Sequence, residues 1–522
     1  MLNNRAGCST PPGAKLRSLP RRRWNNPPVN PDVSLSPLSP VSLDADVLVI
    51  GAIASEGGAT LLSSEPIPGI PADLAAFGFS GKADELVRFP SRDGKAPTVA
   101  VIGMGAVADT VALRNAAGSA VRQLAGAASV IIDFPLDTEA DALAVVEGAT
   151  LGAYSFPNFR GKTKSKQKAP VQKVIVATSL TVDAVALERI AVVGDSVRLV
   201  KDLMNTPGAQ LSPQGFADAA IAAADGLNVS VEVWDENKLA EERCGGIIGV
   251  GQGSSRKPRL VKVSYEPKDA AQHLAFVGKG ITFDTGGYAI KPWDAMLTMH
   301  HDMGGAAVLL GVTLAAARLA LPVRITAWLC LAENMVSSTA IRPNDILTMR
   351  DGTTVEVINT DAEGRLVMAD GLSLASEQYP DAIIDVATLT GAAIVSLGRR
   401  TAGVMGDPGL VAQVAAAGNV TGEAHWPMPL PAELRGLLDS KFADLANINA
   451  AVRDGGMLVA GIFLNEFVGA QRDGSGKIPW VHLDIAGTGT NNGPGYGATG
   501  DGGTGASVRT LLTVVEEFAT IR

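Results

Sequence analysis

The chain has 522 residues, of which 46% are hydrophobic and 19% are charged, and its formal net charge is −9. This length predicts two or more domains with substantial cores, and the negative charge disfavours nucleic-acid binding, which needs a basic face. Three scattered cysteines and the lack of an eighteen-residue apolar run predict a cytoplasmic protein without disulfides, zinc fingers or membrane contacts.

The first 43 residues are rich in arginine and proline and contain no acidic residue before Asp32. They lack the apolar core of a signal peptide, and their prolines oppose the amphipathic helix of an organellar transit peptide. We therefore expect residues 1–43 to be a disordered tail, or the product of an over-extended start codon.

A first domain is expected over residues 44–181, where predicted strands and helices alternate. Strands are expected over 45–51, 98–102, 129–134 and 173–178, and helices over 106–124 and 139–154. This alternation predicts a mostly parallel sheet with helices on both faces. The basic run at 160–168 interrupts the pattern and is interpreted as a solvated loop.

A helix over 182–204 is expected to link this domain to a second one over 205–522, which begins at the breaker Asn205-Thr206-Pro207-Gly208. Helices are expected over 213–224 and 236–243, and strands over 229–233 and 259–265, so the second domain is also α/β. The glycine-rich segments 249–253 and 493–505 are interpreted as a turn and a flexible loop.

The stretch from residue 355 to residue 366 carries the strongest functional signal. A β-prone run leads into Asn359-Thr360-Asp361-Ala362-Glu363-Gly364-Arg365, and a helix-forming run follows at 366–374. A buried carboxylate without a partner is very costly, and divalent cations are natural partners for converging carboxylates. The end of a strand that opens a helix is also where α/β proteins build active sites.

A second polar stretch follows the buried strand expected at 274–277. It contains Gly278-Lys279-Gly280-Ile281-Thr282-Phe283-Asp284, then Lys291, then His300-His301-Asp302 ahead of a helix over 306–319. Its glycines allow close approach of backbone to a ligand. One lysine near a metal could lose its proton and become a ligand, while the other stays charged and stabilises an oxyanion.

Together these stretches resemble the leucyl aminopeptidase family. The resemblance is carried by 277–287, 302–307 and 359–366, with support from 332–335, 385–392 and 482–488. It runs from about Val193 to the end of the chain and is weak before that. It implies an N-terminal macro-like α/β domain and a C-terminal α/β peptidase domain with a mixed sheet flanked by helices.

The resemblance also implies a two-metal exopeptidase. Lys279, Asp284, Asp302 and Glu363 would hold one ion, and Asp284, Asp361 and Glu363 the other, as Mn²⁺ or Zn²⁺, with Mg²⁺ or Co²⁺ as alternatives. The two cations would share a hydroxide of lowered pKa. Lys291 would stabilise the gem-diolate, and Arg365 would hold a bicarbonate ion as general base.

Substrates and assembly are implied in the same way. The expected substrates are peptides with a free amino terminus, with leucine or another apolar residue in a pocket walled by Met299, Thr388, Leu389 and Gly391. The family forms homohexamers, which we expect here. Thr285, Tyr288 and Ala289 depart from the family pattern outside the functional positions, and His300 and His301 are interpreted as supporting or surface residues rather than ligands.

Two alternatives stay open from the sequence. Val99-Ala100-Val101-Ile102-Gly103-Met104-Gly105 ahead of a helix is similar to a dinucleotide-binding fingerprint, with Asp133 as the acid, and would indicate an oxidoreductase. The acid lies too far along the chain, so close packing of strand and helix is the preferred interpretation of these glycines. A non-catalytic DNA-binding regulator is the other alternative, and the negative charge disfavours it.

Overall fold

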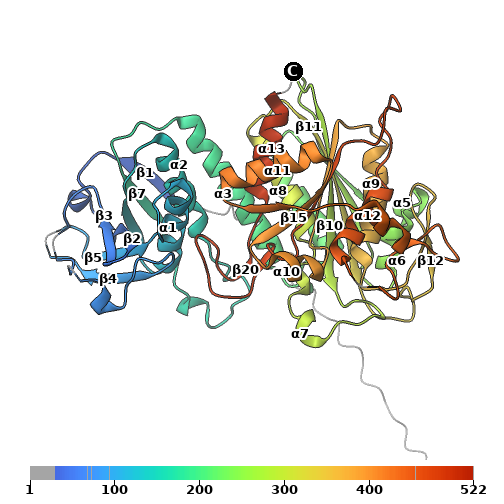
Figure 1. The fold of residues 1–522 in the computed structure, drawn as a ribbon, viewed down its shortest axis with the longest axis horizontal. Helices are drawn as coiled ribbons and strands as arrows, with labels where there is room; N and C mark the ends of the chain where they lie inside the picture. The colour runs from blue at the N-terminus through green and yellow to red at the C-terminus, as the bar shows by residue number, and fades with distance from the viewer. Residues whose placement is uncertain (1–29, 68, 72, 93, 453, 521–522) are drawn as a thin grey trace, which may run out of the picture.

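The computed structural model describes residues 30–520 except 68, 72, 93 and 453, and it forms two lobes joined by the helix α3 (Ala184–Met204) (Figure 1). The arginine- and proline-rich start, residues 1–29, lies outside the described residues, so its prediction is not examined by the structure. Across the described ranges, no helix combines the length and apolarity needed to cross a bilayer.

The first lobe is built on one mostly parallel sheet with the order β1-β7-β6-β2-β5-β4, and β3 pairs with β2. Only β3 and β4 run antiparallel to their neighbours. The strands are β1 (Asp32–Ser36), β2 (Val47–Ser55), β3 (Gly58–Leu62), β4 (Leu86–Pro90), β5 (Thr98–Gly103), β6 (Ser129–Asp133) and β7 (Lys173–Ala177). The parallel core strands are buried on both faces, which fits their continuous apolar sequences.

Helices cover only one face of this sheet, so the prediction of helices on both faces is wrong. The helices α1 (Thr110–Gln123) and α2 (Glu139–Gly152) share one core, while the opposite core is closed by residues such as Leu74 and Phe79 from loops and short 3-10 turns. The crossovers β5-α1-β6 and β6-α2-β7 step in the same direction along the sheet. Right-handed connections that step in the same direction lie on the same face.

The strand β1 lies inside the segment that was predicted as a tail, so that prediction is wrong from Asp32 onward. β1 pairs in parallel with β7 from Asp32 opposite Lys173 to Ser36 opposite Ala177. Its partner is more than a hundred residues away along the chain, which is why local composition did not predict it. The basic run at 160–168 is exposed between α2 and β7, as expected.

The second lobe contains an eight-stranded mixed sheet with the order β16-β15-β18-β14-β10-β11-β9-β8. Its central strand β10 is almost wholly buried and runs parallel to both neighbours, β11 and β14. The strands are β8 (Ser230–Trp234), β9 (Arg259–Tyr265), β10 (His273–Asp284), β11 (Arg324–Asn334), β14 (Ala382–Ala387), β15 (Thr401–Gly406), β16 (Ala424–Pro427) and β18 (Trp480–Asp484). The expected mixed sheet is confirmed.

Helices flank this sheet on both faces. α8, α11 and α13 lie on one side of β10, and α6, α9 and α12 lie on the other (Figure 1). The remaining helices are short or peripheral. The helices are α4 (Pro213–Ala224), α5 (Glu236–Glu241), α6 (Gly245–Gly251), α7 (Trp293–Met296), α8 (Gly304–Arg318), α9 (Glu363–Ser376), α10 (Gly391–Leu397), α11 (Pro408–Thr421), α12 (Gly456–Glu466) and α13 (Val508–Thr520).

Two glycine-rich segments differ from their predictions. Residues 249–251 are the last residues of the helix α6 and do not form a turn. This helix packs closely against α9, since a Cβ on Gly246 would lie 2.2 Å from the carbonyl oxygen of Leu366. Segment 493–505 includes the strand β20 (Gly502–Gly503), which pairs with β19 (Thr490–Asn491). Its tip reaches the first lobe, where the Gly497 N–H donates to Asp84 and the Gly497 carbonyl accepts from Arg122.

The dinucleotide-like stretch also packs differently than expected. A Cβ on Gly103 would lie 2.0 Å from the carbonyl oxygen of Lys82, so this glycine accommodates the loop before β4 rather than a helix. Asp133 is buried and accepts the backbone N–H of Ser64. Both residues therefore have structural partners inside the lobe.

Candidate active site

The predicted ligand residues meet at the carboxyl edge of the central sheet. Lys279 and Asp284 are part of β10, whose register against β11 shifts between Ile281 and Phe283. Irregularities of this kind are common beside active sites, where they redirect a side chain. Asp302 lies two residues before the start of α8, and Glu363 is the first residue of α9, where the helix dipole favours a carboxylate.

Lys279 bridges two of the carboxylates. Its Nζ lies 2.8 Å from Asp302 Oδ2 and 3.0 Å from Glu363 Oε1, and it donates to the carbonyl oxygen of Thr388 at 3.2 Å. The lysine and both acids are buried. In this arrangement the ammonium group neutralises carboxylates that would otherwise repel one another.

Lys291 bridges the other two carboxylates. Its Nζ lies 2.9 Å from Asp284 Oδ2 and 2.6 Å from Asp361 Oδ1. Asp284 is buried, whereas the side chains of Lys291 and Asp361 keep 16% and 31% of their exposure. Lys291 and Asp361 therefore face the solvent side of the cluster, where a substrate would arrive.

The cluster has more acceptors than its two lysines can satisfy. It holds four carboxylates against two ammonium groups, and potential ligand atoms of Asp284, Asp361 and Glu363 all lie within 4.8 Å of one another. Asp302 Oδ2 and Asp361 Oδ1 are at ion-pair distance from lysines but outside hydrogen-bond geometry, and Glu363 Oε2 has no partner among the described residues. Buried oxygen atoms without donors, arranged in this way, fit divalent cations.

The pKa shifts in the cluster also favour the binding of cations. Burial raises the pKa of Glu363 and Asp302, each further raised by the Asp284 carboxylate, and Lys279 offsets this only in part. Burial lowers the pKa of Lys279, but Asp302, Glu363 and Asp284 outweigh burial and raise it overall. The four carboxylates of the cluster therefore resist ionising together, and added positive charge would favour their ionised forms.

Two residues that hold the cluster in place had no role in the sequence analysis. Asn334, at the end of β11, donates its amide to Asp284 Oδ1 at 2.8 Å and to the carbonyl oxygen of Thr360 at 3.0 Å. The Thr360 hydroxyl donates to the carbonyl oxygen of Gly286 at 2.6 Å and accepts from the backbone of Ala289. Both lie in stretches that carried the family resemblance, which was the only available signal.

Arg365 lies in the first turn of α9, and its side chain is buried. It donates to the carbonyl oxygen of Asn447 at 2.6 Å, and its Nε has no partner among the described residues. Burial lowers the pKa of Arg365 to about 10. Asn447 also accepts the backbone N–H of Ile358 through its side chain, so it anchors the loop before Asp361. Nothing in the sequence singled out Asn447.

A cleft opens beside the cluster. A cavity of about 190 Å³ is lined by Asp361, Glu363, Arg365, Leu389 and Gly391, among others. A second cavity of about 370 Å³ shares Arg365 and Gly391 and adds apolar residues. Two of the four predicted substrate residues, Leu389 and Gly391, therefore face the cleft.

The other two predicted substrate residues lie close to the cluster but do not line these cavities. Thr388 donates its hydroxyl to Asp302 Oδ1 at 2.8 Å. Met299 lies in the 3-10 turn Met299–His301, directly before Asp302. Thr388 therefore orients a candidate ligand, besides any contact with substrate.

The departures from the family pattern lie around the cluster. His301 is buried, and the centre of its ring lies 3.9 Å from that of the tilted His300 ring; neither histidine joins the carboxylate group that could hold a metal among the described residues. Tyr288 is 46% exposed and donates its hydroxyl to the carbonyl oxygen of Ser337.

The comparisons with known proteins all lead to one family. The model of the cytosol aminopeptidase family catalytic domain matches residues 198–512, and the model of the family's N-terminal domain matches residues 73–163. A probable cytosol aminopeptidase of Leifsonia xyli is 54% identical over 493 residues, which cover 94% of this chain and 99% of the relative. One from Clavibacter michiganensis is 50% identical, with the same coverage.

A solved structure has the same fold. The bottromycin maturation enzyme BotP in complex with Mn is 35% identical, with a TM-score of 0.79, and the match covers 91% of this chain and all of that one. An α/β fold with a buried carboxylate–lysine cluster at its sheet edge defines a metal-dependent hydrolase. More particularly, the chain belongs to the cytosol aminopeptidase family and is a metallo-exopeptidase.

Proposed function

We propose that this enzyme removes leucine and other apolar residues from the free amino terminus of peptides, using two divalent ions. The observation that carries the proposal is the buried cluster of four carboxylates and two lysines beside an open cleft, in which Glu363 Oε2 has no partner among the described residues. We assign Lys279, Asp284, Asp302 and Glu363 to one ion, and Asp284, Asp361 and Glu363 to the other.

Manganese or zinc is the proposed metal, with magnesium and cobalt as alternatives. The manganese complex of the structural neighbour supports manganese, and a set of carboxylate oxygens suits it. When bound, two such ions supply Lewis acidity and a water of lowered pKa, and they bind the α-amine of the substrate. For Lys279 to act as a ligand, its amine must lose the proton that it shares here with Asp302 and Glu363.

Lys291 is proposed to stabilise the gem-diolate that develops at the scissile carbonyl. It lies at the open side of the cluster, and burial lowers its pKa less than Asp284, Glu363 and Asp361 raise it, so it stays charged. One such donor is worth about 3–4 kcal/mol in the transition state.

Arg365 is proposed to hold a bicarbonate ion, which supplies a general base when bound. Its unpartnered Nε and its place in the wall of the cleft support this role. Asn447 fixes the guanidinium group by accepting from Nη1, so the remaining N–H groups keep one orientation.

The cleft supports a preference for apolar side chains. The apolar side chains in its larger part are Ala392, Ile448, Val452 and Val459, and they lie beside the polar Asn359, Arg365, Asn449 and Asp454. We propose Met299, Thr388, Leu389 and Gly391 as the substrate contacts nearest the ions. We further propose a cytoplasmic homohexamer with a first domain that begins at β1 and ends at 181 and a second domain at 205–522, and relatives named as cytosol aminopeptidases support that compartment.

The decisive experiment compares free and blocked substrates. We expect hydrolysis of leucyl-p-nitroanilide and of short leucyl peptides when Mn²⁺ or Zn²⁺ is added, and none of their amino-acetylated forms, because the free amine is needed for binding at the ions. Treatment with a chelator should abolish the activity, and the added metal should restore it. Cleavage of acetylated peptides would contradict the proposal.

A further inference from the structure

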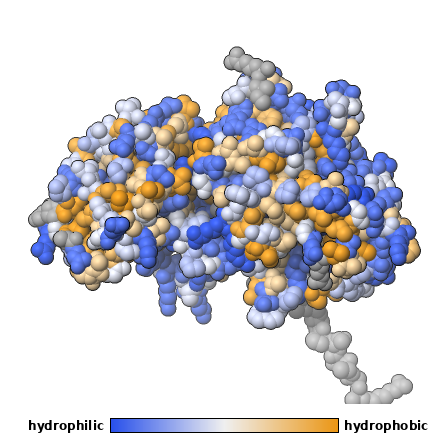
Figure 2. Space-filling view, viewed as in Figure 1, coloured by the Kyte–Doolittle hydropathy of each residue, from blue (hydrophilic) through white to orange (hydrophobic). Residues whose placement is uncertain are grey.

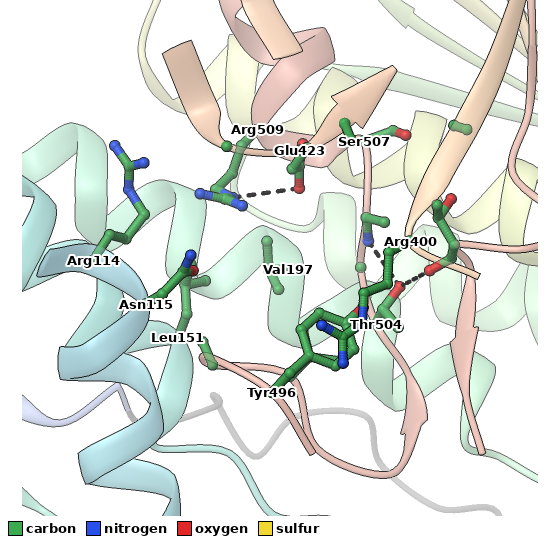
Figure 3. A pocket seen from close by; sticks show the side chains of 18 of the residues that line it. Arg114, Asn115, Leu151, Val197, Arg400, Glu423, Tyr496, Thr504, Ser507 and Arg509 are labelled. Carbon is green, nitrogen blue, oxygen red and sulfur yellow. Dashed lines mark hydrogen bonds and ion pairs between the residues drawn. The ribbon is translucent and has the colours of Figure 1, made fainter. Parts of the chain in front are cut away.

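A second cavity lies where the two lobes meet, away from the carboxylate cluster. It encloses about 120 Å³ between α1 and α2 of the first lobe, the linker α3, and the loops around β15, β16 and α13. On the face shown in Figure 2, the surface between the lobes is hollowed and hydrophilic. Figure 3 shows Arg114, Arg400 and Arg509 reaching toward this cavity from three separate elements.

Four cationic side chains line the cavity, and only two of them have carboxylate partners. Arg114 Nε lies 2.5 Å from Glu147, and Arg509 contacts both Glu147 and Glu423 at 3.3–3.4 Å. Lys201 and Arg400 form no ion pair within the described residues. The cavity therefore keeps an excess of positive charge.

Lys201 is an unusual residue in this position because it is 97% buried, with only 3% of its surface exposed. Its Nζ lies 4.9 Å from the centre of the Tyr154 ring, a cation–π contact that supplies no counter-charge. Burial lowers the pKa of Lys201 to about 8, Arg198 and Arg509 lower it further, and the nearby Asp202 carboxylate offsets this only in part. Asp202 accepts the Tyr154 hydroxyl and forms no ion pair with Lys201. A buried cation that lacks a direct anionic partner is costly unless a ligand provides one.

The cavity also offers an unpartnered hydroxyl and a fixed guanidinium plane. Thr488 is buried, and its Oγ1 has no hydrogen-bond partner among the described residues. The Arg400 Cζ atom lies 3.8 Å from the centre of the Tyr496 ring, a cation–π contact that helps to hold this side chain (Figure 3). Lysine, arginine and hydroxyl donors in one cavity are the groups that recognise oxyanions.

We propose that this cavity binds a small oxyanion, held by Lys201, Arg400 and Thr488, with Arg114 and Arg509 adding charge. A cavity of about 150 Å³ accepts benzene, so 120 Å³ suits a ligand of a few non-hydrogen atoms such as inorganic phosphate or the carboxylate end of a free amino acid. Bound there, the anion would contact α1 of the first lobe and α13 of the second, and so tie the lobes together.

The test is a calorimetric titration of the metal-loaded full-length enzyme with inorganic phosphate, at constant ionic strength in chloride. We expect saturable binding that Lys201→Met and Arg400→Gln each weaken at least tenfold. Lys164→Met, which removes a cation from the exposed loop 160–168, is the matched control and should leave the isotherm unchanged. Competition with acetate and with leucine then distinguishes a phosphate ligand from a carboxylate one.

Two further experiments control for binding of phosphate to the metal ions and for unfolding of the variants. Because phosphate also binds metal ions, the titration is repeated on chelator-treated enzyme, in which the cavity site must persist. Lys201→Met replaces a buried residue, so its thermal unfolding is recorded, while Arg400 is exposed and its variant should fold normally. If neither phosphate nor a carboxylate binds saturably, or if the Arg400 variant binds as the parent does, the proposal is wrong.

Discussion

Glu363 is the residue at which the two proposed metal sites converge. It is 1% exposed, pairs with Lys279 through Oε1, and leaves Oε2 without a partner among the described residues. One carboxylate can neutralise two adjacent cations through its two oxygens, whereas an amide carries no charge. The environment of Glu363 therefore predicts a large effect when its carboxylate is replaced by an amide.

Glu363→Gln should abolish hydrolysis and lower the metal content of the purified enzyme. Metal analysis and turnover of leucyl-p-nitroanilide are the measurements. Glu433→Gln, at an exposed position in the 3-10 turn Ala432–Leu438, is the matched control and should keep full activity. Two ions per chain with near-normal turnover in the Glu363 variant would refute the bridging assignment.

Lys291→Ala should lower kcat about 10²- to 10³-fold and raise KM much less, because the ammonium interacts with the charge on the substrate only as the oxyanion develops. His300→Ala should change the rate by less than tenfold, about 1.4 kcal/mol. Metal content must be measured in parallel, since Lys291 also pairs with Asp284 and Asp361. A large rise in KM at unchanged kcat would make Lys291 a binding residue only.

At the scale of elements, the site depends on how closely α8 approaches the sheet. A Cβ on Gly305 would lie 2.0 Å from the carbonyl oxygen of Val386 in β14, and one on Gly278 would lie 2.6 Å from the Cα of Ala306. These glycines let the backbone of α8 pack directly against the backbone of the sheet. Because Asp302 lies only two residues before the start of α8, the position of this helix sets the position of a candidate ligand.

Gly305→Ala should therefore destabilise the enzyme by about 1–3 kcal/mol and reduce its metal content, since backbone must move to admit the methyl group. Gly311→Ala in the same helix is the control, because its Cβ would first meet the Val200 side chain at 3.0 Å, and a side chain can adjust. Thermal unfolding and metal analysis compare the two variants. Equal effects of both substitutions would show that the close approach at Gly305 is unimportant.

At the scale of the whole molecule, the prediction concerns assembly. Large apolar residues around α7, beside the cleft, are exposed: Ile290 at 62%, Trp293 at 76% and Leu297 at 64%. Exposed apolar groups that cluster in this way are common at protein interfaces. They support a homohexamer whose active sites face an enclosed interior and admit only small peptides.

Light scattering should accordingly give several times the monomer mass of 53.7 kDa, close to six copies. The enzyme should cleave di- and tripeptides while leaving the amino terminus of a folded protein intact, because the enclosed interior excludes it. A folded protein whose amino-terminal leucine lies on a long flexible extension is a useful control, since that extension could reach the site. Full activity of a monomer would refute the assembly prediction.

The sequence by itself determined where along the chain the candidate site lies, because its residues are clustered locally. Asp361, Glu363 and Arg365 lie within five residues at a strand–helix junction, and Lys279 and Asp284 lie on one buried strand, so residue type and spacing predicted a cation site. The proposed roles of these residues rest on the family resemblance. Alternation of apolar and polar runs likewise predicted the α/β class and most helices. These features depend on neighbours along the chain.

Only the tertiary structure decided the features that depend on distant partners. Asn447 reaches Arg365 because β17 (Leu445–Ala446) pairs with β13 (Thr354–Glu356), and β1 is a strand because β7 lies beside it. The cavity between the lobes gathers Arg114, Lys201 and Arg400, which are 87 and 199 residues apart along the chain. Such contacts depend on how whole elements pack against one another, so no local sequence pattern predicts them.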